Sequence, residues 1–502
     1  MDLDELIESL PIHRPPPMLT RPVQVVDITD DSRTVLPGSL FVARPGLAFD
    51  ARVCIADAVR DGASAILTDA VGAERVDRSR AVCLIAEDVE RAGAALAERL
   101  YRNPSSALRL VGITGTNGKT TVAHLAHGLV NAGVDRCGLI GTVQIDDGRE
   151  VAEAEMTTPP AIELSRTLAT MVESGCVSAV MEVSSHALER GRVSALSFDV
   201  GVFTTLGTDH MDFHESSEAY LRSKRRLFEM LPGDGVAIVN ADDAAYGAIL
   251  EGCRARVVRC SLVSGDATVR VLERRVDGLR VALDGAFGSF EADLPLTGDH
   301  NAMNLLMAVQ IAHELGADSA SIARGLECPS VPRGRLEPVG GGDIDVFVDF
   351  AHTPDALERT LTEVRRAMEG SRPGSVLWVV FGCGGEKDRT KRPVMGEIAA
   401  GLAHRVVLTS DNPRSESSEA IIREILAGIP REKRNRVDVH ADRELAIAHA
   451  VLGASPGDVI VLAGKGHERV QTGLGRGGAV RTVAFDDVAC ARKYIMQRME
   501  SE

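Results

Sequence analysis

The chain has 502 residues, too many for one hydrophobic core, and at roughly 100–200 residues per domain it is expected to fold as about three domains. Its 56 Lys and Arg against 72 Asp and Glu give a formal charge of −16, which argues against a nucleic-acid-binding protein. The N-terminus lacks a secretory pattern, no run reaches the roughly 18–20 apolar residues of a membrane span, and no CxxC pair occurs, so we expect a cytoplasmic protein with reduced thiols.

The first predicted unit is a small α/β domain over residues 1–106. Short β-rich runs alternate in it with helical ones, at residues 23–28, 56–60, 65–68, 82–85 and 90–100. Residues 103–106 (Asn-Pro-Ser-Ser) are expected to be a linker, because these residue types interrupt regular structure.

Two longer α/β units follow, at residues 107–336 and 337–502. Their strands are predicted from short apolar runs that end in polar or glycine-bearing loops, at 110–113, 179–181, 200–203, 236–239, 346–348, 376–380, 406–409 and 459–463. The pattern predicts an α/β fold with a doubly wound central domain. Chemically distinctive residues follow these runs, and in such folds ligands bind at the carboxyl edge of the sheet. We therefore expect the site in a cleft between domains.

A phosphate-binding loop is predicted where the first strand of the central unit ends. The run 110–113 is followed by Thr-Gly-Thr-Asn-Gly-Lys-Thr-Thr at 114–121, and helical spacing then starts at Val122. Strand, glycine turn and helix N-terminus form an anion cradle, in which Lys119 can reach phosphates and Thr120 can bind Mg²⁺. The spacing departs from the standard motif, and a plain tight turn is the alternative. The candidate nucleotide-binding residues of this loop are Gly115, Thr116, Asn117, Gly118, Lys119, Thr120 and Thr121.

Further motifs follow in order: Glu-Val-Ser-Ser-His-Ala-Leu (182–188), Asp-His-Met-Asp-Phe-His (209–214), Gly-Asp-His-Asn-Ala-Met-Asn (298–304), Asp-Phe-Ala-His-Thr-Pro-Asp (349–355) and Asp-Asn-Pro-Arg (411–414). In this order, over essentially the whole chain, they resemble the Mur ligases. The resemblance implies an N-terminal UDP-binding domain, a central ATPase domain and a C-terminal Rossmann-like domain. It implies an ATP- and Mg²⁺-dependent ligase of peptidoglycan synthesis, active as a monomer, that adds meso-diaminopimelate to UDP-N-acetylmuramoyl-L-alanyl-D-glutamate through an acyl phosphate.

The resemblance also assigns residues around the nucleotide. Lys119, Glu182, His210 and Lys224 are the implied catalytic residues. Thr120, Glu182, His210 and Lys224, the last as a carbamate, are the implied metal ligands. Asn301 is expected near the adenine, Arg335 near the phosphates and Asp349 at the ribose. Two of these residues have simpler alternatives: Lys224 could belong to a solvated basic helix face, and Asp349 could cap a helix.

A second group is assigned to the sugar nucleotide and its dipeptide. Ser32 resembles a UDP-contacting position, and the loop at 45–50 is expected beside the uracil. The residues expected to hold the muramoyl-dipeptide are Thr157, Thr158, Ser184, Arg190 and Arg192. Many relatives have glutamine where this chain has Arg190, so the contact of this residue with the dipeptide is expected to differ from theirs.

The amino acid is expected at Asp411, Asn412, Pro413, Arg414, Gly464, Glu468 and Lys387. A guanidinium pairs bidentately with a carboxylate, so Arg414 should bind the far carboxylate of diaminopimelate, which lysine lacks. Glu468 should pair with the distal amino group. Relatives typically have arginine at the position of Lys387, where it contacts the carboxylate of the amino acid. Arg389 is an alternative residue for this contact.

The sequence alone is compatible with other functions. They are a lysine-adding Mur ligase, a related ligase such as a folylpolyglutamate synthetase, a nucleotide-dependent switch or transport NTPase, and a catalytically silent relative that only binds ligands. The Asn-Pro-Arg motif at 412–414 and the UDP-like N-terminal unit disfavour the other ligases. The intact phosphate loop disfavours the silent relative.

Overall fold

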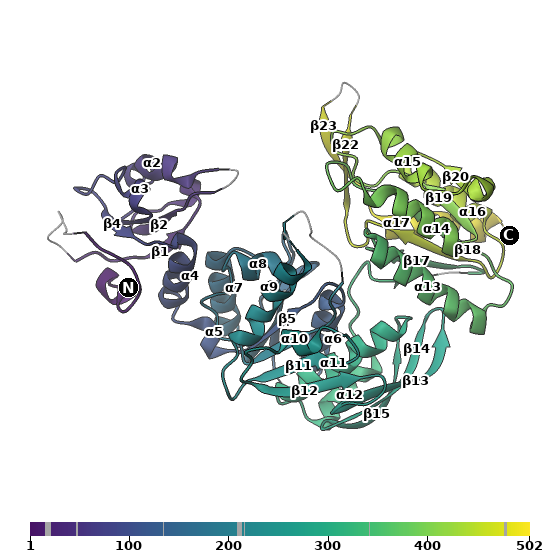
Figure 1. Cartoon of the computed structure of the whole chain (residues 1–502), viewed down its shortest axis with the longest axis horizontal. Coiled ribbons are helices and arrows are strands. Elements are labelled where there is room, and N and C mark those ends of the chain that lie inside the picture. Colours follow the sequence, from purple (N-terminus) through teal and green to yellow (C-terminus); the bar gives the residue numbers. More distant parts are fainter. Residues whose placement is uncertain are drawn as a thin grey trace.

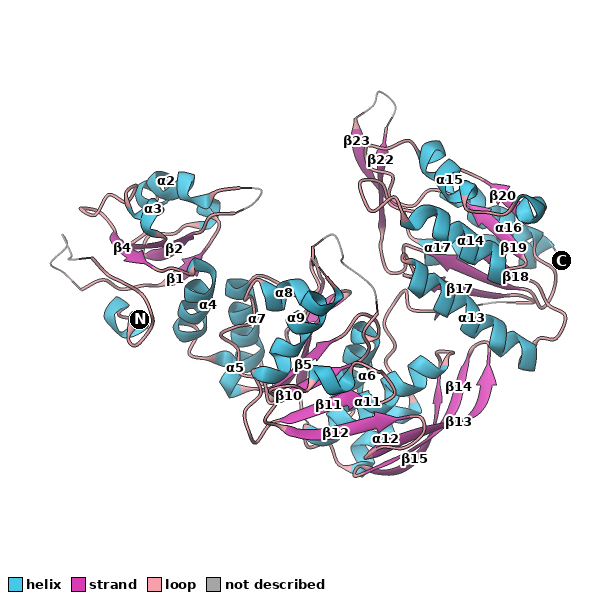
Figure 2. Ribbon diagram, viewed as in Figure 1, coloured by secondary structure: helices cyan, strands magenta, loops and turns pink. Residues whose placement is uncertain are grey.

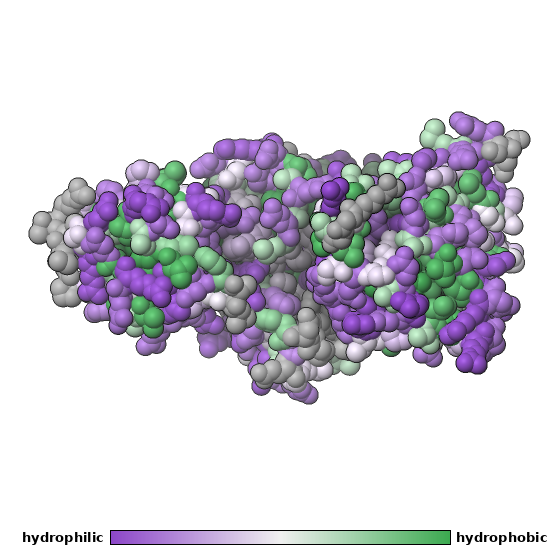
Figure 3. All heavy atoms as spheres, turned by 90° about the horizontal axis from the view of Figure 1, so that it is seen from above, coloured by the Kyte–Doolittle hydropathy of each residue, from purple (hydrophilic) through white to green (hydrophobic). Residues whose placement is uncertain are grey.

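The computed structural model describes residues 1–15, 22–46, 49–133, 135–207, 213–214, 216–340, 342–475 and 479–501. Three α/β units follow one another in space as they do in the sequence, with the N-terminal and C-terminal units at opposite ends (Figure 1). Seen from above, the surface is mainly hydrophilic, with apolar side chains gathered over the two end units (Figure 3). No helix within these residue ranges is long and apolar enough to cross a membrane.

The N-terminal unit is a parallel four-stranded sheet in the order β1-β2-β3-β4 with helices around it. Its strands are β1 (Asp27–Thr29), β2 (Ser39–Ala43), β3 (Ala65–Thr68) and β4 (Val82–Ile85). Its helices are α1 (Leu3–Ile7), η1 (Ser32–Thr34), η2 (Ala51–Cys54), α2 (Ile55–Arg60), α3 (Ala70–Ala73) and α4 (Val89–Leu100). The strand expected at 23–28 is shorter than predicted, because only residues from Asp27 onward pair with β2.

The linker expected at 103–106 is wrong in part, because a short helix, α5 (Pro104–Ala107), forms there. Pro104 occupies the first helical position, where a missing N–H costs nothing. Asn103 before it has a left-handed backbone with φ of 52°, which turns the chain into the helix. The two units are thus joined by a structured turn, and α5 packs against α7 (Ala161–Glu173) of the central unit.

The central unit is built on an eleven-stranded sheet in the order β15-β14-β13-β12-β11-β10-β5-β9-β6-β7-β8. Its parallel strands are β5 (Arg109–Thr114), β6 (Cys137–Ile140), β9 (Ser178–Glu182), β10 (Val200–Phe203), β11 (Val236–Asn240) and β12 (Arg256–Ser261). Further strands extend both edges. On one side these are the antiparallel β7 (Gln144–Asp146) and β8 (Val151–Glu153). On the other side β13 (Ala267–Arg275) lies parallel to β12, and β14 (Gly278–Gly285) and β15 (Gly288–Leu294) follow in antiparallel order. These extensions were not predicted.

The helices of the central unit are α6 (Lys119–Asn131), α7 (Ala161–Glu173), α8 (Ser185–Glu189), α9 (Ser217–Glu229), α10 (Tyr246–Ile249), α11 (Asp299–Glu314) and α12 (Ser319–Glu327). Helix α11 is apolar on nearly all sides and is buried from Asn301 to Ala312. It packs against α6, the helix that follows the phosphate loop. This packing fixes the loop on a rigid support.

The C-terminal unit has a six-stranded sheet in the order β16-β17-β21-β18-β19-β20, with helices on both faces (Figure 2). Its strands are β16 (Glu337–Pro338), β17 (Asp345–Asp349), β18 (Leu377–Phe381), β19 (Arg405–Leu408), β20 (Val437–Val439) and β21 (Val459–Ala463). Its helices are α13 (Pro354–Ser371), α14 (Lys391–Leu402), α15 (Ser418–Ala427), η3 (Arg431–Arg436), α16 (Arg443–Gly453) and α17 (Asp487–Ser501). A separate hairpin, β22 (Val470–Leu474) and β23 (Val480–Ala484), projects from the unit (Figure 1).

Candidate active site

The phosphate loop joins the end of β5 to the start of α6 and is pressed against the neighbouring strand β10. A Cβ on Gly115 would lie 1.9 Å from Thr204 Oγ1, and one on Gly118 would lie 2.7 Å from Asn304 Oδ1, so both positions require glycine. The Thr116 N–H donates to Thr205 O at 2.7 Å. The loop is therefore held in one shape, with the N-terminus of α6 open for an anion.

A buried carboxylate lies beside this loop. Glu182, fully buried at the end of β9, accepts the Thr120 hydroxyl on Oε2 at 2.9 Å. Thr142 donates its backbone N–H to Glu182 Oε1 at 2.7 Å and its hydroxyl to Oε2 at 2.9 Å. Lys119 folds over the loop, with Nζ 2.8 Å from Gly115 O. Sequence reasoning missed Thr142, although it follows the end of β6 at the same sheet edge.

The segment that joins the central and C-terminal units brings Arg335 to the same place. Arg335 Nη2 lies 3.4 Å from Thr120 Oγ1, and the guanidinium lies 5.0 Å from the centre of the Phe350 ring. Its Nε is buried without a hydrogen-bond partner among the residues the structure describes. A guanidinium facing the phosphate loop with an unused donor is suited to an oxyanion.

Asp349, the expected ribose contact, is bound to the hinge between the two units. Its Oδ2 accepts the Leu336 N–H at 2.8 Å, and its Oδ1 accepts the Ala351 N–H at 2.9 Å and the Thr360 hydroxyl at 3.2 Å. Leu336 has a left-handed backbone with φ of 47°. Burial raises the pKa of Asp349, although Arg335 opposes this. Its carboxylate therefore holds the strained hinge residue in place.

These side chains surround a cleft of about 330 Å³ between the central and C-terminal units. The predicted residues that line it are Thr116, Asn117, Gly118, Lys119, Thr120, Thr121, Thr157, Glu182, Asn301, Arg335 and Asp349. Asn301 uses its side chain within the start of α11, where Nδ2 donates to Thr297 O at 2.8 Å. Burial lowers the pKa of His300, which also lines the cleft, to about 4, so this ring is neutral near pH 7.

Lys224 lies on α9, outside the residues that line the cleft. It is 1% exposed, and its Nζ lies 4.2 Å from the centre of the Tyr220 ring one turn earlier. The Tyr220 hydroxyl lies 3.2 Å from Thr116 Oγ1, which connects α9 to the phosphate loop. The solvated basic face considered for Lys224 is therefore wrong. The predicted metal ligand His210 lies outside the described residues.

Several residues predicted for the dipeptide are connected to the backbone of Glu182 through hydrogen bonds. The Thr158 hydroxyl donates to Glu182 O at 2.8 Å, and Arg192 Nη1 donates to Thr158 O at 2.8 Å. Ser184 caps α8 and lies beside Thr158. Burial, and next the charge of Arg190, lower the pKa of Arg192. Two such cations in one place favour an anionic ligand.

Ser32 lies apart from this group, in the N-terminal unit. It begins η1, which Asp31 caps through the Arg33 N–H at 2.9 Å. The Arg33 side chain holds the pKa of Asp31 at about 2. In the loop expected beside the uracil, Leu47 and Ala48 lie outside the described residues.

A second pocket, of about 470 Å³, also lies between the central and C-terminal units. Asn412, Arg414 and Glu468 line it from the C-terminal side, while strand β8 lines it from the central side. An ion pair of 3.0 Å between Arg469 and Glu153 bridges the two sides. Three of the residues expected to bind the amino acid therefore line one pocket.

A buried lysine that sequence reasoning missed organises the pocket. Lys465 is fully buried and donates to Glu468 Oε2 at 3.0 Å and to Asn412 Oδ1 at 3.3 Å. Asn412 Nδ2 donates to the same Glu468 oxygen at 2.7 Å. Lys465 lies in the Gly-Lys-Gly-His-Glu motif at 464–468, so its position in the motif was the available signal.

The remaining predicted residues take different places around this pocket. A Cβ on Gly464 would lie 2.7 Å from Asp411 Oδ2, and burial raises the pKa of Asp411. A Cβ on Gly385 would lie 1.9 Å from Pro413 O, so Pro413 is part of a tight backbone contact. Lys387 is exposed and does not line the pocket. The alternative residue, Arg389, pairs with Glu424.

Fold and site define the class of protein: a phosphate-loop α/β protein with a second polar pocket between the same two units. Residues 113–312 match the family described as "Mur ligase middle domain", and residues 334–466 match "Mur ligase, glutamate ligase domain". The chain belongs to the Mur ligase family, and it is a ligase. The predicted family and α/β fold are confirmed, and the switch NTPase is excluded.

Individual relatives match most or all of the chain. The chain is 40% identical to "UDP-N-acetylmuramoyl-L-alanyl-D-glutamate--2,6-diaminopimelate ligase" of Synechococcus elongatus, over 511 residues that cover all of both chains. It is 40% identical to a protein of the same name from Pseudomonas aeruginosa, covering 91% of this chain and 93% of the other. A solved structure with this name is 30% identical, with a TM-score of 0.69 and 99% of each chain covered. The fold is shared by the solved structure of MurF ligase from Thermotoga maritima in complex with ADP. The two chains are 17% identical, with a TM-score of 0.63, and the match covers 95% of this chain and 98% of that one.

Proposed function

We propose that this ligase joins meso-diaminopimelate to UDP-N-acetylmuramoyl-L-alanyl-D-glutamate, with ATP as the energy source, in the cytoplasmic steps of peptidoglycan synthesis. The observation that carries the proposal is the polar pocket in which Arg414 and Glu468 occur together, beside the nucleotide cleft. The full-length relatives carry the name of this activity. We further propose that the protein acts as a monomer.

The nucleotide phosphates would lie on the phosphate loop, between Lys119 and Arg335. The fit is supported by the open N-terminus of α6 and by the unused Nε of Arg335. Thr120 and Glu182 present the hard oxygen atoms that Mg²⁺ prefers, and we include His210 and Lys224 as a carbamate in the same set. Bound there, Mg²⁺ would neutralise charge on the transferred phosphoryl group.

The dipeptide would be held by Thr157, Thr158, Ser184, Arg190 and Arg192, with Ser32 contacting the UDP. Arg192 donates to Thr158 and lies near a second arginine, so this region favours the anionic dipeptide. Held there, the γ-carboxylate of D-glutamate would attack the γ-phosphorus of ATP, and ADP would leave. Lys119 stabilises the negative charge that spreads over the phosphoryl oxygens.

The acyl phosphate would then be attacked by an amino group of diaminopimelate. The new C–N bond forms as the C–O bond to phosphate breaks, and inorganic phosphate leaves with the proton that the attacking nitrogen loses. Asn412 and Glu468 would orient the amino acid, and the walls that both units give to the cleft would limit access of the water that hydrolyses the intermediate. Most of the rate enhancement thus comes from positioning.

Arg414 and Glu468 supply the selectivity for the amino acid. The Arg414 guanidinium would bind the carboxylate at the far end of diaminopimelate, and Glu468 the neighbouring ammonium. Lysine has an ammonium but no carboxylate there, so it would leave the guanidinium without its partner. Selection therefore follows from charge and from bidentate geometry.

The test is phosphate release from ATP with UDP-N-acetylmuramoyl-L-alanyl-D-glutamate and a panel of amino acids. We expect release only when both co-substrates are present, and the highest kcat/KM with meso-diaminopimelate. Faster turnover with L-lysine would assign the chain to the lysine-adding enzymes. No release with any amino acid would refute the proposal.

A further inference from the structure

The amino-acid pocket depends on two loops that follow neighbouring strands of the C-terminal sheet. Residues 382–387 follow β18, and residues 409–416 follow β19. The Gly385 N–H donates to Asn412 O at 2.9 Å, and Arg414 Nη1 donates to Gly385 O at 2.6 Å. The direction of the Arg414 guanidinium is therefore set by the first loop.

The backbone of both loops is strained at this contact. Glu386 has φ of 56° and Arg414 has φ of 55°, in the left-handed region that residues other than glycine rarely adopt. Such conformations persist only when the surrounding structure holds them. Some neighbouring group must therefore fix both loops together.

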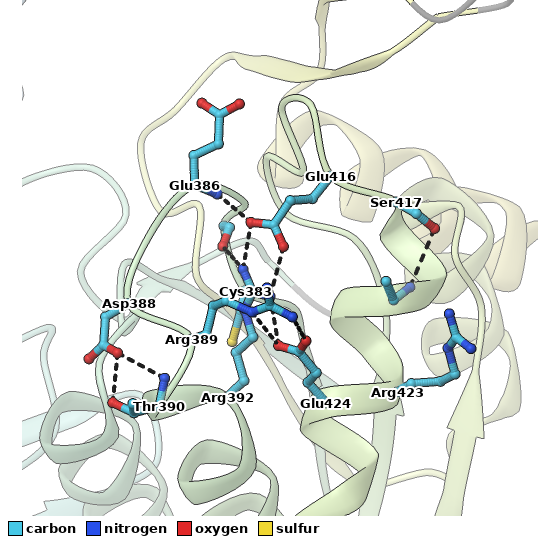
Figure 4. Close-up of polar contacts among 12 residues, drawn as sticks. Cys383, Glu386, Asp388, Arg389, Thr390, Arg392, Glu416, Ser417, Arg423 and Glu424 are labelled. Carbon is cyan, nitrogen blue, oxygen red and sulfur yellow. Dashed lines mark hydrogen bonds and ion pairs between the residues drawn. The ribbon is translucent and has the colours of Figure 1, made fainter.

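Arg392 is that group. It lies at the start of α14, is fully buried, and reaches both loops (Figure 4). Its Nη2 donates to Gly384 O in the first loop at 3.1 Å and to Glu416 Oε1 in the second at 2.9 Å. Its Nη1 donates to Glu416 Oε2 at 3.0 Å and to Glu424 Oε2 on α15 at 2.8 Å.

Glu416 continues the connection back to the first loop. Its Oε1 accepts the Glu386 N–H at 2.5 Å, which is the amide of the strained residue (Figure 4). In return, the Glu386 carboxylate accepts the Ser415 N–H at 3.3 Å. The buried Arg392 and the partly exposed Glu416 thus form a brace between the loops, and neither side chain lines the pocket.

We propose that Arg392, through Glu416, is a positioning residue for the amino-acid substrate, because it fixes the loop geometry that aims Arg414. The identity of that substrate rests on the proposed function, whereas the brace itself does not. Loosening the brace should weaken binding of the amino acid and leave ATP binding intact, because neither Arg392 nor Glu416 lines the nucleotide cleft.

The test compares Arg392→Gln, Arg392→Lys and Glu416→Gln with the matched control Arg423→Gln. Arg423 is an exposed arginine on α15, next to Glu424, and its Nε donates to Glu419 O. We expect the KM for meso-diaminopimelate to rise by about 10- to 100-fold in Arg392→Gln, since a misplacement of about 1 Å can have such an effect. The KM for ATP should not change. Arg392→Lys should recover part of the loss, and Arg423→Gln should match the wild type.

Amide hydrogen exchange of the ligand-free protein gives a second measurement that does not depend on the substrate. We expect faster exchange at Glu386 and Arg414 in Arg392→Gln and Glu416→Gln, but not in Arg423→Gln. Should Arg392→Gln fail to fold, Glu416→Gln carries both measurements. Unchanged exchange and unchanged amino-acid KM would overturn the inference, as would equal losses of ATP and amino-acid binding. If the wild type does not use diaminopimelate but exchange is still faster in Arg392→Gln and Glu416→Gln, the proposed function is wrong and the inference about the brace is supported.

Discussion

The Thr120 hydroxyl donates to Glu182 Oε2 at 2.9 Å, so the first turn of α6 and the end of β9 meet at one oxygen atom. Glu182 is fully buried, and its carboxylate also accepts the N–H and the hydroxyl of Thr142. A buried carboxylate next to a phosphate loop has the chemistry of a Mg²⁺ ligand.

Glu182→Gln should keep the fold, because the amide oxygen can still accept the Thr142 N–H and the amide nitrogen can donate to the Thr120 and Thr142 hydroxyls, which accept as well as donate. The loss of charge should weaken Mg²⁺ binding and lower kcat for ADP release by on the order of 100-fold or more. A Mg²⁺ titration of ADP release measures this. The exposed Glu189→Gln is the control, and wild-type turnover in Glu182→Gln would remove Glu182 from the metal site.

Arg414→Ala should lose selectivity for diaminopimelate over lysine. A hydrogen bond to a charged group is worth about 1.5–3 kcal/mol, so the ratio of the two kcat/KM values should fall by about 10- to 100-fold. Arg481→Ala, at an exposed position on β23, is the matched control. An unchanged ratio in Arg414→Ala would mean that another group binds the far carboxylate.

Asp349→Asn separates a hinge role from a ribose contact. Asparagine has one acceptor oxygen in place of two, so at least one of the donors at Leu336 and Ala351 would lose its partner. We expect a loss of about 1–3 kcal/mol in the free energy of unfolding, measured in urea. Asp345→Asn, at the other end of β17, should cost less because Asp345 pairs with Arg372 near the surface. Weaker nucleotide binding with unchanged stability would instead support a ribose contact.

Glu416 should make stability depend on pH in the acidic range. Arg392 lowers its pKa from 4.5 to about 2 in the folded protein. Such a carboxylate stabilises the fold fully above pH 4.5, and this contribution is lost as the pH falls from 4.5 towards 2. The difference in unfolding free energy between wild type and Glu416→Gln should therefore shrink over this range. A difference that stays constant with pH would contradict the shifted pKa.

Much of the core fold follows from local pattern. The strands β10 and β21 lie where apolar runs ended in polar loops, and β17 and β18 differ from prediction by one residue at each end. The antiparallel strands β7–β8 and β13–β15 were missed because exposed sheet edges lack continuous apolar runs. The helix at Pro104 was missed because its residue types also occur in linkers.

The site could be predicted only in part, for a physical reason. Motif spacing placed Thr120 and Glu182 at one sheet edge, where the structure joins them. It could not show that Arg392 and Glu416 brace two loops, because that contact depends on how α14 packs against the sheet. Nor could it show that Asp349 accepts a hydrogen bond from the hinge residue Leu336, since a carboxylate after a strand has several possible partners.

Both ligand cavities take one wall from the central unit and the other from the C-terminal unit. A ligand that moves these walls at one cavity would therefore also move them at the other. Such linkage is reciprocal: if nucleotide raises the affinity for the amino acid by some factor, the amino acid must raise the affinity for nucleotide by the same factor. The two co-substrates would then cooperate without touching.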